Sequence, residues 1–156
     1  KRLAEDTGET ATLEVPVEDT MLILDEVTTR HLLGASGNVG TRWPIHATST
    51  GKVFIAFEPR GPSRLRQELV ALTGKTITQH DKLEQQLSDI RRRGFAETVD
   101  ELEDGFSGVA AVVRGGMGEA LGALSICGPS SRLSKDRRAQ FGATLCTVAA
   151  TLQPRY

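Results

Sequence analysis

Alternating apolar and polar residues, the pattern of half-buried β-strands, open the chain. Residues 10–17 alternate moderately, and residues 20–28 are rich in β-branched and aliphatic side chains. Both segments are predicted to be strands, joined at Glu18-Asp19. His31-Leu32-Leu33 is a short third strand candidate, followed by a glycine-rich loop. The first part of the chain therefore predicts a small antiparallel sheet.

A second group of strands follows Gly94. Residues 95–99 are predicted to be extended, and the acidic segment 100–104 is predicted to be a loop. Two apolar runs, residues 105–114 and 119–127, flank a glycine-rich turn and predict a β-hairpin.

Helical spacing of apolar residues separates and follows these strands. The predicted helices cover residues 49–57, 63–72, 81–93 and 134–152, and the last two have the clearest apolar faces. Residues 1–8 resemble the last turn of a helix closed by a glycine, which predicts that this chain is the C-terminal part of a longer protein. Strands in two groups with helices between and after them indicate an α+β fold with a largely antiparallel sheet.

Composition and charge narrow the functional classes. The 156 residues suffice for one domain, and 38% hydrophobic with 25% charged residues is typical of a soluble globular protein. A net charge of −1 provides no excess of positive charge that would attract nucleic acid. No apolar run is long enough to span a bilayer. Cys127 and Cys146 have no recognisable metal or disulfide spacing, which predicts two reduced thiols in a cytoplasmic protein without a cofactor or metal.

The segment from Gly40 to Lys52 is the most informative part of the chain. It contains the only Trp, Trp43, followed by Pro44, which biases the preceding residue towards an extended conformation. Thr48 or Ser49 is predicted to cap the helix that follows. The first backbone N–H groups of a helix and its positive dipole end form a small anion receptor, so this segment predicts a site for a small acid.

Catalytic patterns in the same segment are weak. Ser49-x-x-Lys52 matches a two-residue nucleophile pattern whose companion motifs are absent. His46 lies next to the predicted helix start, where packing or a backbone hydrogen bond is the favoured role. A small hydrolase that uses Ser49 with Lys52 or His46 is therefore kept as an alternative. A purely structural dimerisation module with a filled pocket is a further alternative.

Six motifs, each weak alone, occur in order along the whole chain. They are Leu3-Ala4-Glu5-x-Thr7-Gly8-Glu9-Thr10-Ala11-x-Leu13, Gly40-x-Arg42-x-Pro44-Ile45-His46-Ala47-Thr48-x-x-Gly51-Lys52, Leu72-Thr73-x-x-Thr76-Ile77, Leu87-x-x-Ile90-Arg91-x-Arg93-Gly94-Phe95, Gly105-Phe106-x-Gly108-Val109-Ala110-Ala111 and Ala123-Leu124-Ser125-Ile126-x-Gly128-Pro129. As an ordered set they resemble the effector-binding domain of IclR-type bacterial transcriptional regulators.

The resemblance implies a GAF-like (profilin-like) α+β domain, with a curved, mainly antiparallel sheet, helices on its faces and a pocket on one side. Residues 1–8 would be the end of an interdomain linker helix and residues 9–156 the effector-binding domain. It also implies an N-terminal winged helix-turn-helix domain that binds DNA and is not included in these residues. The protein would be a non-enzymatic repressor or activator that forms a homodimer or homotetramer.

The resemblance further implies a set of effector-binding residues. They are Ser49, Thr50, Thr98, Gly108, Ser125 and Cys127. Trp43 and Phe106 are expected to add apolar walls to the same effector-binding site. Ser125 and Cys127 are two residues apart on one predicted strand, so their side chains share a face. Some relatives place an acidic residue at the position of Thr98, a thiol at Gly108 and a hydroxyl at Cys127. These departures predict a less polar cavity, and hence a larger or aromatic acid as effector.

Overall fold

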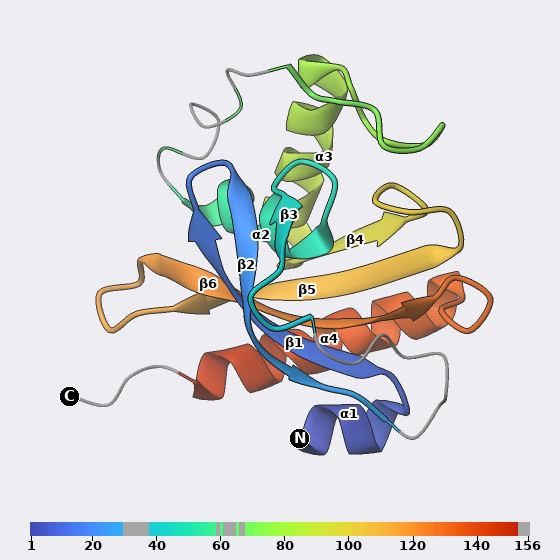
Figure 1. Ribbon diagram of the computed structural model, residues 1–156. Coiled ribbons are helices and arrows are strands. Elements are labelled where there is room, and N and C mark those ends of the chain that lie inside the picture. The colour runs from blue at the N-terminus through green and yellow to red at the C-terminus, as the bar shows by residue number, and fades with distance from the viewer. Residues whose placement is uncertain (30–37, 59, 61–64, 66–67, 153–156) are drawn as a thin grey trace.

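The computed structural model describes residues 1–29, 38–58, 60, 65 and 68–152. Its strands are β1 (Thr10–Val17), β2 (Thr20–Val27), β3 (Arg42–Pro44), β4 (Phe95–Val99), β5 (Phe106–Arg114) and β6 (Ala120–Pro129). Its helices are α1 (Arg2–Thr7), α2 (Ser49–Phe57), α3 (His80–Arg93) and α4 (Lys135–Thr151). The strands form one curled antiparallel sheet in the order β3-β2-β1-β6-β5-β4 (Figure 1). The pairing of β1 with β6 joins the two groups of strands that lie far apart in the sequence.

The two faces of the sheet carry different cores, because successive side chains of a strand point to opposite faces. Val109 and Ala111 of β5 face α4 and pack against Leu145. Ala110 of β5 and Ala123 of β6 belong to the opposite core, which α2 and α3 complete (Figure 1). The sheet is therefore covered by helices on both faces. Within the described residues, no helix is long and apolar enough to cross a membrane.

Helix α2 lies deep in the molecule, and all its residues from Ser49 to Ala56 are buried. Thr48 is its N-cap, with an extended backbone and a side-chain oxygen that accepts the N–H of Gly51 at 3.1 Å. Pro44 ends strand β3 only a few residues earlier, so the chain turns sharply from strand to helix. The predicted extended segment, cap and helix are all confirmed, and the helix start is held against the sheet.

Replacing Thr48 by Ala should destabilise the protein by about 1 kcal/mol, because the Gly51 N–H loses its acceptor in a buried position. Urea unfolding followed by the fluorescence of Trp43 would measure the change. Thr144 is the matched control: it is exposed on α4, and its hydroxyl only returns to the Gln140 carbonyl. Thr144→Ala should be neutral or slightly stabilising. A Thr48→Ala variant as stable as the wild type would contradict the capping role.

Two predicted elements need comment. The strand candidate at residues 31–33 lies outside the described residues. Much of the predicted helix 63–72 also lies outside them, and its described end, residues 68–72, is not helical. There the Thr76 hydroxyl accepts the backbone N–H groups of Leu72 and Thr73 and donates to the carbonyl of Glu101. These side-chain hydrogen bonds take the place of helical backbone bonds. The helical spacing of the leucines therefore did not predict the structure of residues 68–72.

Candidate functional site

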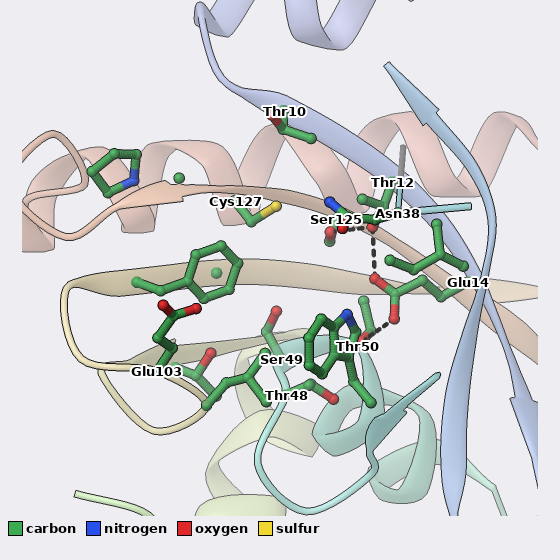
Figure 2. A pocket seen from close by; sticks show the side chains of 18 of the residues that line it. Thr10, Thr12, Glu14, Asn38, Thr48, Ser49, Thr50, Glu103, Ser125 and Cys127 are labelled. Carbon is green, nitrogen blue, oxygen red and sulfur yellow. Dashed lines mark hydrogen bonds between the residues drawn. The ribbon is translucent and has the colours of Figure 1, made fainter. Parts of the chain in front are cut away.

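A cavity of about 430 Å³ opens between the start of α2 and the sheet face that α2 covers (Figure 2). All six strands contribute residues to its sheet wall, and residues 48–50 contribute the helix wall. The loop of residues 102–105 borders it on a further side. An open space of this size fits a small organic molecule. This observation argues against the alternative of a structural dimerisation module whose pocket is filled by side chains.

All eight residues expected at the effector site line this one cavity. They are Trp43, Ser49, Thr50, Thr98, Phe106, Gly108, Ser125 and Cys127. Strand register explains the convergence on the sheet, because Gly108 pairs with Thr98 on one side and with Cys127 on the other. Side chains directly opposite each other in an antiparallel sheet share a face. Their contact with a ligand remains a prediction.

Gly108 lets α2 approach the sheet. A Cβ atom at this position would lie 2.8 Å from the Ser49 Oγ atom and 3.6 Å from the Thr98 Oγ1 atom. Any larger residue would therefore push against the first turn of α2. A side chain at position 108 would therefore require the Ser49 hydroxyl to move, and it would take up space in the cavity.

Glu14 is the main residue that sequence reasoning missed. It lies on β1, it is 5% exposed, and its carboxyl group lines the cavity. Its Oε1 atom accepts the Thr12 hydroxyl and its Oε2 atom accepts the Thr50 hydroxyl, both at 2.7 Å. The Thr12 and Ser125 hydroxyl oxygens are 2.6 Å apart, so four side chains form one continuous chain (Figure 2). Burial raises the pKa of Glu14 above its ordinary value, although the two hydroxyl bonds oppose this effect.

Further charged residues surround the cavity. Glu26, Glu103 and Asp104 contribute carboxylates, so the cavity has more charge than the departures at positions 98, 108 and 127 predicted. Arg132 also lines it, but its guanidinium group is bound to buried Glu9, with Nη2 2.8 Å from Oε2. The alternation of Thr10, Thr12 and Glu14 along β1 was the available signal, because all three share the face of Ser125 and Cys127.

The environment of Cys127 favours its protonated thiol. Burial raises its pKa to about 12, and the nearby carboxylates of Glu14, Glu26 and Glu9 contribute in the same direction. The thiolate is the nucleophilic form of cysteine, and such a pKa keeps the group protonated at neutral pH. Cys127 is therefore a small, neutral part of the wall.

Lys52 and His46, the two groups that the hydrolase alternative would use with Ser49, are bound to other partners. The Lys52 ammonium group lies 2.5 Å from Glu101 Oε2 and 2.7 Å from Gln86 Oε1. The His46 Nε2 atom is 3.0 Å from the carbonyl oxygen of Val70, as the favoured backbone role predicted. Neither group pairs with Ser49 as a base would. In the described part of the chain, no three His, Cys, Asp or Glu side chains are placed to hold a metal ion.

Known proteins share both the sequence pattern and the fold. The family model described as bacterial transcriptional regulator IclR C-terminal matches residues 1–153. The transcriptional repressor IclR of Escherichia coli strain K12 is 31% identical over 161 residues, which cover 100% of this chain and 59% of the repressor. The acetate operon repressor of Salmonella typhimurium is 32% identical, with the same coverage of 100% and 59%. This chain thus spans less than two thirds of the length of these curated relatives.

A solved structure shows the same architecture. The C-terminal domain of the Escherichia coli transcriptional regulator KdgR has a TM-score of 0.83 and 29% sequence identity, and the match covers 96% of this chain and 88% of that chain. The GAF-like fold is therefore confirmed. Because the relatives are named repressors and regulators of transcription, the hydrolase alternative is set aside. The chain belongs to the IclR family of bacterial transcriptional regulators and corresponds to their C-terminal domain.

Proposed function

We propose that residues 9–156 bind a small organic or aromatic acid and serve as the sensing and oligomerisation domain of a cytoplasmic DNA-binding regulator. The effector would favour one arrangement of a homodimer or homotetramer and so change operator binding by the DNA-binding domains. A ligand shifts such an equilibrium only through its different affinity for the two arrangements. A coupling free energy of about 1–3 kcal/mol would change operator affinity about 5–150-fold.

The cavity between α2 and the sheet carries this proposal. Its helix wall includes Ser49 and Thr50, which lie in the first turn of α2. The helix itself supplies no acceptor for backbone N–H groups there, and its dipole favours an anion. Trp43, Ile23 and Phe106 provide apolar surface in the same cavity. An aromatic or longer aliphatic acid combines the two properties that these walls offer.

Removing the hydroxyl of Ser125 is the direct test. Titration calorimetry of the protein with small carboxylates, including benzoate and pyruvate, should identify a bound acid. Ser125→Ala should weaken its binding about 10–150-fold, since a hydrogen bond to a charged group contributes about 1.5–3 kcal/mol. Thr50→Val should have a smaller effect, because the Thr50 hydroxyl already donates its proton to Glu14 Oε2.

Ser107 provides the matched control for this test. It is a buried serine on β5 that points to the opposite face of the sheet, and its hydroxyl contacts Ser130 at 2.8 Å. Ser107→Ala should leave acid binding unchanged. Equal affinities in wild type and Ser125→Ala would contradict the placement of the effector's carboxylate beside Ser125 in this cavity.

A further inference from the structure

The hydrogen-bonded chain in the cavity wall has two possible directions. When Glu14 is ionised, both its oxygens accept, so the Thr12 and Thr50 hydroxyls each donate to it. A hydroxyl has one proton, and therefore Ser125 must donate to Thr12 across their 2.6 Å contact. Ser125 and Thr50 then present only lone pairs to the cavity. In this state, these hydroxyls cannot receive a carboxylate.

One added proton reverses the chain. If Glu14 carries it on Oε1, the carboxyl group donates to Thr12, and Thr12 can then donate to Ser125. The Ser125 hydroxyl is released and can donate into the cavity. The proton comes from solvent and stays on Glu14, and no covalent bond other than this O–H bond is made. Ser125 thus changes from a hydrogen-bond acceptor into a donor towards the cavity, while Thr50 still donates to Glu14 Oε2.

Electrostatics favour the protonated state once an anion is present. Glu26 on β2 pairs with Thr12, and its charge raises the pKa of Glu14 in addition to burial, whereas Cys127 on β6 is a neutral thiol. On the side of α2, Glu14 contacts the uncharged hydroxyl of Thr50. The Lys52 ammonium group, which also lies on α2, is bound to Glu101 instead. A carboxylate ligand would add one more negative charge beside Glu14. Like charges in a shared site raise the pKa of a carboxyl group.

We propose that the acid effector binds together with one proton, which resides on Glu14 and makes Ser125 a hydrogen-bond donor to the effector's carboxylate. This inference rests on the proposed acid-sensing function. Glu14 would thereby determine specificity: anions are accepted only with proton uptake, whereas neutral ligands of similar shape are accepted without it. The affinity for acids consequently depends on pH, although the acid itself stays ionised.

The sign of the pH dependence follows from linkage. The complex holds more protons than the free protein once the pH exceeds the pKa of Glu14 in the free protein. Above that pKa, the Kd of an acid should rise about tenfold per pH unit, and below it the Kd should be constant. Titration calorimetry with benzoate between about pH 6 and pH 9, in buffers of different ionisation enthalpy, measures both Kd and proton uptake. Uptake should approach about one proton per benzoate at the upper end.

Three comparisons assign the proton to Glu14. Benzamide is the neutral probe and should bind without proton uptake at any pH. Glu14→Gln keeps a neutral hydrogen-bonding side chain, so benzoate binding should become independent of pH and lose its uptake. Glu103→Gln removes a carboxylate that lines the same cavity but is not one of the four hydrogen-bonded side chains. This variant should retain the proton uptake. The wild-type measurement stands even where a variant fails to fold.

The outcomes separate this inference from the proposed function. Benzoate binding by the wild type with no proton uptake and a constant Kd overturns the inference and leaves acid sensing intact. Uptake that persists in Glu14→Gln overturns the assignment to Glu14. Failure of both wild type and Glu14→Gln to bind benzoate at every pH contradicts the proposal of an aromatic-acid sensor itself.

Discussion

Replacing Lys52 by Met is expected to destabilise the protein by about 3–5 kcal/mol, because it leaves the carboxylate of Glu101 without its partner in a buried position. The Lys52 side chain is 0% exposed and that of Glu101 only 8%. Burial lowers the pKa of Lys52, and the neighbouring Glu101 carboxylate opposes this effect. Each charge of the pair therefore depends on the other to offset its loss of hydration. Urea unfolding at neutral pH would measure the loss.

Lys75 offers the matched control for Lys52. Its ammonium group lies 2.8 Å from Asp100 Oδ2, but its side chain is 63% exposed. Exposed ion pairs contribute little to stability, so Lys75→Met should be nearly neutral. The double variant Lys52→Met/Glu101→Leu should recover much of the stability lost in Lys52→Met, because it removes the unpaired charge. Similar unfolding midpoints for Lys52→Met and Lys75→Met would show that the buried pair is unimportant.

Gly51→Ala is expected to cost at least about 3 kcal/mol, at the upper end of the range for overpacking a buried site. A Cβ atom at position 51 would collide with the backbone of Ile45, including its carbonyl oxygen. A backbone segment cannot move aside as a flexible side chain can. The substitution would otherwise be favourable, since Ala is a better helix former than Gly. Thermal and urea unfolding would measure the net effect.

Gly74 provides the matched control for Gly51. A Cβ atom there would meet nothing within 4 Å. Gly74→Ala should therefore leave stability nearly unchanged. Wild-type stability in Gly51→Ala would mean that the turn from residue 45 to the start of α2 is looser than the structure indicates.

The local elements that sequence reasoning predicted well are those with strong internal signals. Leu83, Leu87 and Ile90 recur at helical spacing and form the buried face of α3, which ends at Gly94 as predicted. The hairpin of β5 and β6 follows from two apolar runs around a glycine-rich turn. The predicted helix at residues 63–72 is wrong at residues 68–72, where the Thr76 side chain binds the backbone N–H groups of Leu72 and Thr73, which periodicity does not show.

The candidate site divides in the same way. Ser125 and Cys127 were placed on one face by the period of a strand, and a cap at Thr48 or Ser49 was predicted from their position before an apolar run. Glu14 was overlooked because a carboxylate in an alternating strand is ordinarily an exposed residue. Only the pairing of β1 with β6, far away in the sequence, turns it inward towards Ser125.

The sequence by itself determined the secondary structure of most of the chain, the α+β class and the family resemblance, because these depend on local periodicity and on ordered motifs. The tertiary structure decided which polar residues meet. It paired Lys52 with Glu101, placed Arg132 on Glu9, and linked Glu14 through Thr12 to Ser125. Such contacts depend on strand register and on the seating of α2 against the sheet. Both are set by packing between distant segments, which no local pattern encodes.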